Sequence, residues 1–461
     1  MSLENNYILN LLKQTGNEIY LVGGVVRDIY LNRPNHDKDI IVVDMPAKDF
    51  AQKFADDNNA SFVTLDEENN IYRVVMEDKI NYVDITNPIN NSLEDDLKRR
   101  DLTINSVAIR LSDNELVDLV GGLEDIKNGV VRAVSEENII DDPLRILRAY
   151  RFASTLGFEI ENDTLTIIKR HLDKVLNPAV ERRNVEIIKL FGGKYAHKVL
   201  EQMDNIGLLD LIFPILEDVK KVPPNTHHHL DLFHHSLATV EELQNLYETS
   251  CDEVKKHLEC VDFGGDTRLA HLKLAGFLHD IGKFRTWTIE GERHRFIMHD
   301  EVGSELAKKI FKVEKYSKKQ IDYIQFVIRN HIYPSSVISA PNINDKIYMR
   351  YVRKADDCAI DLVMIAKADR LTARGPAITD EMVNENISGL DKLLQFYLDV
   401  KPRLKPLPKL LTGDEIMKLK NIKPSKELGE IVSALHEAQL DGDVQTKEEA
   451  VKFVLAFNLQ L

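Results

Sequence analysis

Cysteine is scarce in this sequence, and its placement excludes two kinds of cross-link. The 461 residues include only three cysteines, Cys251, Cys260 and Cys358, at unrelated spacings. Such spacings form neither a disulfide framework nor the paired ligands of a structural zinc site. We therefore expect these cysteines to be ordinary packing residues of a protein that resides in a reducing compartment.

Long apolar runs and the pattern of a secretory leader are also missing. No stretch is long enough to span a bilayer, and the amino-terminal sequence MSLENNYILNLLKQTG lacks the basic start and apolar segment of a signal peptide. We expect a cytoplasmic protein that has no membrane partner.

The sequence has no excess of positive charge. Lysine and arginine number 60 against 75 acidic residues, so the formal net charge is −15. This charge excludes indiscriminate adhesion to nucleic acid or to an anionic membrane, and any polyanion must be held by local basic patches. Four such patches are Lys98 to Arg100, the group Arg145, Arg148 and Arg151, the pair Arg182 and Arg183, and Lys308 to Lys319.

Length and local pattern predict several domains. A chain of 461 residues, 43% of them apolar, exceeds the size at which a single hydrophobic core keeps growing. The first 135 residues mix strand-like runs with helical stretches, whereas the patterns after them are almost wholly helical. The expected strands are Ile40–Val43, Tyr72–Met76, Tyr82–Ile85 and Leu116–Leu119. Proline-rich breaks lead us to divide the chain into residues 1–135, 136–215, 216–395 and 396–461, with an α+β fold overall.

A glycine turn and two aspartates stand out near the amino terminus, in the sequences LVGGVVRDIYLNR and DKD. Side chains alternate along a strand, so Asp37 and Asp39 point to the same face and offer the oxygen ligands that Mg²⁺ uses in phosphoryl transfer. The turn at Gly23 and Gly24 brings amide groups to a phosphate, and Arg27 is available as a charged clamp. Each feature alone is more often a plain turn or a solvated strand end, but their order and spacing together are far more specific.

These motifs resemble the first motif of the class II tRNA nucleotidyltransferases, the family of CCA-adding enzymes and bacterial poly(A) polymerases. Later segments are similar to that family's remaining motifs: LKRRDLTINSVAI, DLVGG, DDPLRILRAYRFA and ERRNVEI. The resemblance implies a small mixed β-sheet nucleotidyltransferase head, in which Asp37 and Asp39 are the catalytic Mg²⁺ ligands, followed by an all-helical neck and body over residues 136–215. It also implies that Arg100 and Asp101 lie beside the nucleotide, where the family recognises its ribose.

The segment DDPLRILRAYRFA contains a candidate base reader. One interpretation is a helix start alone, with Asp142 as N-cap and Pro143 at the first helical position. Asp142 and Arg145, one turn apart, also match the amino donor and ring acceptor that cytosine and adenine share and that uracil and guanine lack. The family uses this pair as a protein template that selects CTP and ATP. It commonly has Glu where this chain has Asp141, and we include Arg148 of the same motif among the nucleotide-binding residues.

The connection between the first two motifs is short. Many CCA-adding members carry a flexible basic segment there that is thought to help the switch from CTP to ATP. This chain instead runs from NYVDIT through NPINNS almost directly into LEDDLKRRD. A short loop also occurs in relatives that add only CC, so complete CCA addition and partial addition of CC or A both stay open.

A second constellation of histidines and aspartates lies in HHHLDLFHHS, LAGFLHDIGK and MIAKADRLTARGP. Adjacent His279 and Asp280 within an apolar helix need a polar partner, and a divalent metal satisfies both. The arrangement resembles the helical HD domain of metal-dependent phosphohydrolases, here over residues 216–395. The ligands it implies are His235, His279, Asp280 and Asp369 for a divalent metal of unspecified identity, with His299 and His331 for a possible second metal and Lys283 near a phosphate. We expect His228 and His234 to be surface neighbours.

Together these features predict a tRNA nucleotidyltransferase that adds C and A to the tRNA 3′ end from CTP and ATP. Arg99, Arg151 and Arg182 are the candidate RNA contacts, with solvated helix faces as the alternative for each, and the helical tail over residues 396–461 is expected to help hold tRNA. The HD domain either hydrolyses phosphate ends or retains a structural or empty metal site. Two interpretations of another class are an HD phosphohydrolase whose head binds RNA and a noncatalytic RNA-binding protein.

Overall fold

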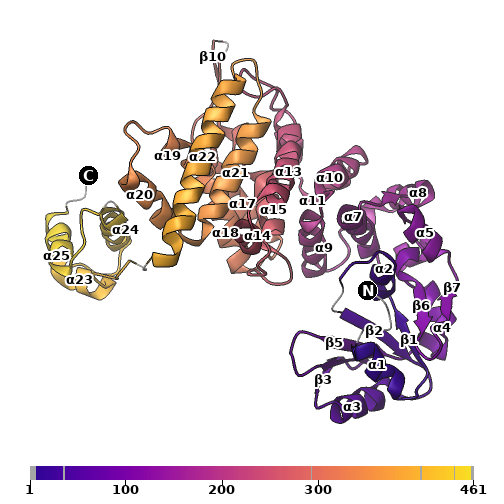
Figure 1. The fold of residues 1–461 in the computed structure, drawn as a ribbon. Helices are drawn as coiled ribbons and strands as arrows, with labels where there is room; N and C mark the ends of the chain where they lie inside the picture. Colours follow the sequence, from indigo (N-terminus) through magenta and orange to yellow (C-terminus); the bar gives the residue numbers. More distant parts are fainter. Residues whose placement is uncertain (1–6, 35–36, 292, 405–406, 441, 458–461) are drawn as a thin grey trace. The chain divides into compact units, whose positions relative to one another are not determined.

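The chain forms two compact units (Figure 1). The computed structural model describes residues 7–34, 37–291, 293–404, 407–440 and 442–457. The first unit runs to Ile215 and includes Glu314–Tyr316, and the second contains the rest of the chain. Among the described residues, no helix combines the length and the apolar character of a membrane span.

The first unit begins with a mixed seven-stranded sheet in the order β3-β4-β5-β2-β1-β6-β7. Its strands are β1 (Ile19–Val22), β2 (Asp37–Val42), β3 (Ser61–Asp66), β4 (Ile71–Val75), β5 (Tyr82–Thr86), β6 (Val107–Arg110) and β7 (Leu116–Asp118). Strands β2 and β5 are parallel and the other neighbours are antiparallel. This mixed sheet, followed by helices, confirms the α+β class.

Three strands were not anticipated from the sequence. Strands β1, β3 and β6 lack a clear alternation of apolar and polar side chains: β1 is buried at every residue, whereas β3 is largely exposed. The sheet carries the helices α1 (Tyr7–Gln14), α2 (Gly24–Tyr30), α3 (Ala47–Asp57), α4 (Leu93–Lys98) and α5 (Gly122–Asn128), with 3-10 turns η2 (Ile89–Asn91) and η3 (Thr103–Asn105). A core of Val22, Ile41, Leu97 and Ala108 joins α4 to the centre of the sheet.

The rest of the first unit is helical apart from one two-stranded bridge. Strand β8 (Val130–Val131) pairs in parallel with β9 (Glu159–Ile160). The helices are α6 (Glu136–Asp141), α7 (Leu144–Leu156), α8 (Asn162–Arg170), η4 (Leu172–Lys174), α9 (Val180–Gly192), α10 (Ala196–Asn205) and α11 (Leu208–Ile212). Helices α7 and α9 pack closely, and Ser154 donates a 2.6 Å hydrogen bond to the carbonyl of Leu190.

The second unit is a helical bundle that also carries a β-hairpin. Its helices are α12 (Leu216–Val219), α13 (Leu232–Thr249), α14 (Asp252–Leu258), α15 (Arg268–Leu278), α16 (Lys283–Thr286), α17 (His299–Val313), α18 (Lys318–Asn330), α19 (Tyr333–Ile338), α20 (Asp345–Ala355), η5 (Asp356–Cys358), α21 (Ala359–Thr372), α22 (Asp380–Val400) and η6 (Lys401–Arg403). The hairpin of β10 (Trp287–Glu290) and β11 (Arg293–Phe296) corrects the prediction of a purely helical domain. It forms around Gly291 at φ 62°, and its strands are too short to produce a clear alternating pattern.

The last helices have a small core of their own. They are α23 (Gly413–Lys420), α24 (Lys426–Leu440) and α25 (Lys447–Ala456), and they bury Ile416, Ile431, Leu435 and Val454 together.

The three cysteines are free, as the sequence predicts, but only one is substantially packed. Cys251 and Cys260 are exposed, and Cys358 is half-buried. The expectation that all three are packing residues was therefore wrong for Cys251 and Cys260, because each lies at an end of the short helix α14.

Candidate nucleotide site and metal centre

A cavity of about 730 Å³ lies against the sheet of the first unit. Its lining includes Asp39 of β2, Asp84 of β5, Arg99 and Arg100. Strand register explains the carboxylates, since Asp39 is paired with Asp84 on the parallel neighbour. The backbone of Asp37 belongs to β2, two residues before Asp39, and its side chain is outside the described part of the structure.

The glycine turn is shaped by what approaches it. Gly23 has φ +77°, and a Cβ there would stand 3.2 Å from both Asp39 Oδ2 and Arg100 Nη1. A side chain at this position would thus be strained by its backbone and would crowd two functional groups. Glycine allows the carboxylate of Asp39 and the guanidinium of Arg100 to meet at the same turn.

Arg27 lies next to this turn and is held by two side chains of the head. Its side chain is buried, its Nη1 donates to Asn105 Oδ1 at 2.7 Å, and its Nη2 donates to Asp28 Oδ1 at 2.8 Å. Burial lowers the pKa of Arg27, although Asp28 acts in the opposite direction. Arg27 does not line the cavity. Its contacts support the Gly23–Gly24 turn, and its role as a phosphate clamp stays a prediction.

Asp96 fixes the two arginines that do line the cavity. This carboxylate is fully buried and accepts hydrogen bonds from Arg99 at 2.6 Å and from Arg100 at 3.0 Å. The spacings of three and four residues place all three side chains on one side of the chain at the end of α4. Asp96 was not among the predicted site residues, although its spacing from Arg99 and Arg100 is visible in the sequence.

Asp101 and Arg148 connect the head to α7. Arg148 Nε donates to Asp101 Oδ2 at 2.7 Å, and Asn105 donates to the other oxygen at 3.1 Å. Burial opposes ionisation of Asp101, but Arg148 and Asn105 outweigh it and lower its pKa. Neither Asp101 nor Arg148 lines the cavity, and the expected place of Asp101 beside the nucleotide stays a prediction.

Arg151 faces the protein interior. Only 15% of its side chain is exposed, and its Nε lies 2.9 Å from Glu186 Oε2. Burial lowers the pKa of Arg151 to about 10 despite this carboxylate. Arg151 is thus paired with Glu186, and its contact with RNA stays a prediction.

The expected template pair lies at the start of α7. Helix α6 ends at Asp141 and α7 begins at Leu144, one residue later than expected. Oδ1 of Asp142 accepts from the Leu144 N–H at 3.3 Å, and Oδ2 accepts from Arg182 at 2.7 Å. The helix N-cap is Pro143 and not Asp142, and base reading by Asp142 stays a prediction. Arg145 donates to the backbone carbonyl of Arg100 at 3.4 Å. Burial lowers the pKa of Arg145 although Asp101 favours its charge.

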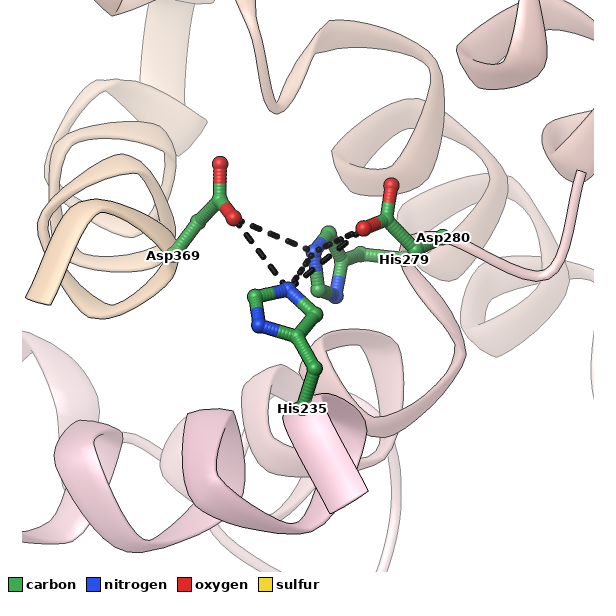
Figure 2. Close-up of side chains that lie close together, drawn as sticks. All are labelled: His235, His279, Asp280 and Asp369. Atoms are coloured by element: carbon green, nitrogen blue, oxygen red, sulfur yellow. Dashed lines mark hydrogen bonds and ion pairs between the residues drawn. The ribbon is translucent and has the colours of Figure 1, made fainter. Parts of the chain in front are cut away.

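In the second unit, His235, His279, Asp280 and Asp369 converge from separate segments (Figure 2). His235 lies on α13, Asp369 lies on α21, and His279 closes α15. Asp280 follows in a turn, which corrects its expected position inside a helix. His235 Nε2 is 3.2 Å from Asp369 Oδ1, and His279 Nε2 is 3.2 Å from Asp280 Oδ2. All four ligand atoms lie within 4.8 Å of one another.

A second group shares Asp280. His299 Nε2 lies 3.2 Å and His331 Nε2 3.6 Å from the other carboxylate oxygen, Oδ1. Asp280 thus faces one set of ligands with each oxygen, an arrangement that suits a bridge between two cations.

The histidine rings are oriented from behind. The Nδ1 atoms of His279, His299 and His331 each lie 2.7 Å from a backbone carbonyl oxygen, which requires a proton on Nδ1. This leaves Nε2 as the atom that faces the carboxylates. His235 Nδ1 contacts the hydroxyl of Thr372 at 3.2 Å, a residue that the sequence analysis did not select.

The chemistry of these donors fits a divalent cation. Both oxygens of Asp280 and Oδ1 of Asp369 are buried, and they face imidazole nitrogens and the Lys283 ammonium without a well-aligned hydrogen bond among the described residues. Burial disfavours a proton on His279, but Asp280 and Asp369 outweigh it and raise its pKa to about 10. Positive charge is therefore required where the imidazole nitrogens meet the carboxylates, and a metal ion meets that requirement. The identity of the ion is not fixed by these ligands.

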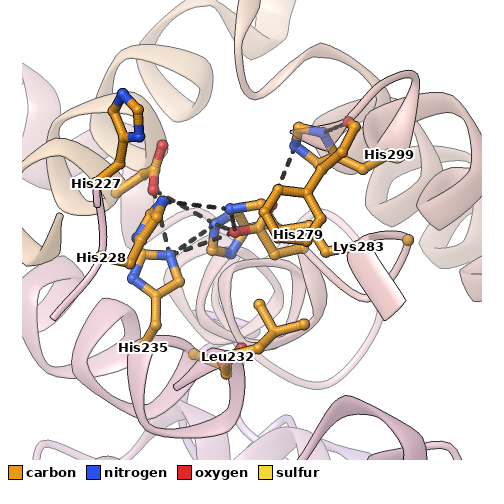
Figure 3. A network of polar contacts seen from close by, with 12 residues as sticks. His227, His228, Leu232, His235, His279, Lys283 and His299 are labelled. Atoms are coloured by element: carbon orange, nitrogen blue, oxygen red, sulfur yellow. Dashed lines mark hydrogen bonds and ion pairs between the residues drawn. The ribbon is translucent and has the colours of Figure 1, made fainter. Parts of the chain in front are cut away.

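Lys283 and His228 complete the surroundings of the cluster (Figure 3). Lys283 Nζ lies 2.5 Å from Asp280 Oδ2 and 3.4 Å from His228 Nε2. The His228 ring is half-buried and packs edge-on against His235 at 4.6 Å between centroids, so the expectation of a surface neighbour was wrong. His234 does face outward, where it contacts Asp231 at 2.7 Å.

The fold and both sites define a nucleotidyltransferase head joined to a helical HD domain. Residues 19–132 match the poly A polymerase head domain, residues 157–220 match the probable RNA and SrmB-binding site of polymerase A, and residues 232–374 match the HD domain.

Relatives of known function extend this assignment over the whole chain. The A-adding tRNA nucleotidyltransferase of Deinococcus radiodurans is 33% identical over 94% of this chain and 94% of its own length. The CC-adding enzyme of Thermus thermophilus is 30% identical over 96% of this chain and 94% of its own length. The CCA-adding enzyme of Ligilactobacillus salivarius is 38% identical over 42% of this chain and 50% of its own length. The chain belongs to the family of tRNA nucleotidyltransferases, whose members are enzymes.

Solved structures share the fold. A CCA-adding enzyme of Thermotoga maritima in complex with tRNA aligns with a TM-score of 0.55 at 22% identity, over 98% of this chain and 96% of that one. A tRNA nucleotidyltransferase with a primer tRNA and an incoming ATP analogue aligns with a TM-score of 0.60 at 21% identity, over 85% and 99%.

Proposed function

We propose that this protein extends the 3′ end of tRNA with C and A nucleotides taken from CTP and ATP. The observation that carries the proposal is the Gly23 turn, at which Asp39 and Arg100 meet beside a cavity large enough for a nucleotide. The full-length similarity to tRNA nucleotidyltransferases supports the substrate class. A cytoplasmic location accompanies this proposal, because tRNA and both nucleotides meet there.

The proposed roles follow from position. Asp37 and Asp39 would hold Mg²⁺, which when bound neutralises the triphosphate. Arg99 and Arg100 line the cavity, where their guanidinium groups would bind the phosphates of the nucleoside triphosphate. The tRNA 3′-hydroxyl oxygen forms a bond to the α-phosphorus, the bond to the β-phosphate oxygen breaks, the hydroxyl proton leaves to solvent, and pyrophosphate departs.

Base selection is assigned to Asp142 and Arg145. Asp142 would accept from the amino group of cytosine or adenine, and Arg145 would donate to the adjacent ring nitrogen. Arg182 holds the Asp142 carboxylate at 2.7 Å, so it positions this carboxylate and is less suited to a direct RNA backbone contact. Asp101 and Arg148 would position these residues, because their ion pair joins the segment that contains Arg100 to α7. Arg99, 52% exposed, remains the RNA contact that the structure supports best among those proposed.

Partial addition is a second candidate, favoured by two observations. Relatives that align along nearly the whole chain are named A-adding or CC-adding enzymes, whereas the CCA-adding enzyme of Ligilactobacillus salivarius aligns over 42% of it. The connection between β5 and α4 is also short, since only residues 87–92 lie between them.

One assay separates these candidates. Purified protein and Mg²⁺ are given tRNAs that end before CCA, after C and after CC, with labelled CTP, ATP, UTP or GTP singly and together. Two C residues followed by one A support the complete activity. A stop after CC indicates a CC-adding enzyme, extension of only the CC-ended tRNA by A indicates an A-adding enzyme, and no incorporation on any tRNA overturns the proposal.

The HD domain is proposed to hydrolyse phosphate esters. A water oxygen forms a bond to phosphorus, the ester P–O bond breaks, and the released alkoxide takes up a proton. The convergence of six candidate ligands supports this role. The alternative is a purely structural metal site, which release of phosphate by the purified protein would exclude.

We propose a catalytic head over residues 1–135, a neck and body over 136–215, the HD domain over 216–395 and a tRNA-holding tail over 396–461.

A further inference from the structure

A second cavity, of about 490 Å³, opens beside the metal cluster of the HD domain. One wall is the turn at Asn225 to His228, and the other is the β10–β11 hairpin with Arg293 and Arg295. Lys283 and His299 connect the cavity to the cluster, since both lie against Asp280. Figure 3 shows His228, Lys283 and His299 around the same space.

The walls carry positive charge and nitrogen atoms without a hydrogen-bond partner among the described residues. None of the described residues that line the cavity is acidic. His228 Nδ1, His294 Nδ1 and Arg295 Nε are buried without a hydrogen-bond partner in the described structure. Glu290 pairs with Arg295 at 3.0 Å, but this pair is exposed and therefore weak. The cavity is built for an anion that supplies several acceptor oxygens.

Both walls are held in place by the fold. The Gly375 N–H donates to the His227 carbonyl at 2.8 Å, and a Cβ on Gly375 would lie 2.4 Å from the His227 carbonyl carbon. The hairpin pairs Trp287 with Phe296, whose ring lies 5.5 Å from the Lys283 ammonium. The cationic groups thus stand on a closely packed turn and a paired hairpin.

We propose that this cavity binds a nucleotide that carries two phosphates, one on its 3′ side at the metal cluster and one on its 5′ side at Arg293 and Arg295. The proposal rests on the proposed HD phosphohydrolase function. Lys283 lies next to the cluster, where the phosphate to be hydrolysed would stand, and the arginines of the hairpin extend the positive wall beyond it. The cavity volume lies in the range of sites that hold a whole small molecule, which exceeds what a lone phosphate needs. The ligand is either the 3′ end of an RNA strand or a free nucleoside 3′,5′-bisphosphate.

The test compares uridine 3′-phosphate with uridine 3′,5′-bisphosphate. Uridine is chosen because the proposed template pair of the head does not match uracil. In the full-length protein we expect the added 5′-phosphate to lower KM for phosphate release roughly tenfold, as a charge-assisted contact does. Arg293→Ala and Arg295→Ala are expected to remove this preference by raising KM for the bisphosphate to that for uridine 3′-phosphate. Equal KM values for both substrates in the wild type, or a preference that survives in both variants, overturn the proposal.

Two further measurements isolate the cavity. Arg285→Ala is the matched control, because Arg285 is an exposed arginine of the neighbouring α16 that does not line the cavity. Calorimetric binding of both uridine nucleotides in EDTA measures affinity without turnover. If the wild type hydrolyses neither nucleotide, the proposed HD function fails. A preference for the bisphosphate that is lost in Arg293→Ala then still supports the cavity, and equal binding overturns it.

The source of the nucleotide is decided by a third substrate. A short uridine-rich RNA with a 3′-phosphate is compared with the free bisphosphate under the same conditions. A lower KM for the RNA identifies a strand end as the ligand, and a lower KM for the free bisphosphate identifies the nucleotide. Either result supports the proposed cavity when the preference depends on Arg293.

Discussion

At the scale of single residues, Asp39 is the described carboxylate on which the proposed nucleotidyl transfer of the first unit depends. Its carboxylate lies at the Gly23 turn, lines the cavity and is paired through its strand with Asp84. Arg100 reaches the same turn because Asp96 holds it. The group that would bind a cation and the group that would bind a phosphate are therefore set side by side by one glycine.

Asp39→Ala is expected to reduce nucleotide incorporation by about a thousandfold, since a lost metal ligand removes several kcal/mol of charge stabilisation. Incorporation of labelled CTP and ATP into tRNA measures this, and phosphate release by the HD domain is expected to persist. Asp113→Ala, at an exposed turn between β6 and β7, is the control. Undiminished incorporation by Asp39→Ala would show that the site assignment is wrong and would favour an RNA-binding head.

At the scale of elements, the segment that follows α21 packs against the turn at residues 225–228 through Gly375. A Cβ on Gly375 would meet the His227 carbonyl carbon at 2.4 Å and the Thr226 oxygen at 2.5 Å. Gly375→Ala is therefore expected to push this turn, and His228 with it, away from the metal cluster. We expect a loss of about 1–3 kcal/mol in the unfolding free energy of the second unit and unchanged nucleotide addition.

Thermal denaturation followed by circular dichroism checks the prediction for Gly375. Gly429→Ala is the matched control, because a Cβ on Gly429 in α24 would meet no atom within 4 Å. Equal stability of the two variants would contradict the role given to this contact.

The packing of α13 against α15 includes a buried lysine. Lys273 is fully buried and donates to Gln244 at 2.5 Å. Burial lowers its pKa from 10.5 to about 7. Between these two pH values the unfolded chain binds a proton that the folded chain does not, so stability rises with pH across this window and is flat below about pH 7.

Lys273→Met is expected to stabilise the protein by about 3–5 kcal/mol at neutral pH and to remove this rise, because it removes the cost of desolvating an ammonium. Urea denaturation of the variant and the wild type between pH 6 and 10 measures both effects. Lys256→Met, at an exposed position of α14, is the control. A wild-type stability that is independent of pH over this range would contradict the lowered pKa.

At the scale of the whole molecule, the two sites lie in separate compact units. Removal of a divalent cation by EDTA is expected to lower the melting temperature of the second unit, and a hundredfold excess of cation over its Kd is expected to restore about 2.7 kcal/mol. Asp369→Asn removes one ligand oxygen at a partly exposed position and is expected to abolish the cation effect while nucleotide addition persists.

Calorimetric scans with and without added Mn²⁺ measure this stabilisation. Asp391→Asn is the control, since Asp391 pairs with Lys367 at 2.7 Å on the neighbouring helix and is outside the cluster. Equal cation-induced stabilisation of the wild type and Asp369→Asn would rule out Asp369 as a ligand.

Much of the architecture and the metal cluster was readable from the sequence. The period of two in a strand placed Asp39 on the face of its neighbour Asp37, and four of the strands were anticipated from local pattern. His279 and Asp280 were singled out because polar groups among apolar residues require partners, and the resemblance to the HD domain added the other candidate ligands. These inferences rest on local spacing, which the chain carries without knowledge of its fold.

Only the tertiary structure decided which charged groups face a site and which face the interior. Arg27 meets Asn105, which is 78 residues away, and Arg151 meets Glu186 on another helix, and local sequence reveals neither partner. His228 reaches the metal cluster because Gly375, far along the chain, approaches its turn. A guanidinium or imidazole has the same local sequence whether it is buried or exposed. Its partner is chosen by segments that meet only on folding, and burial then determines its charge and its role.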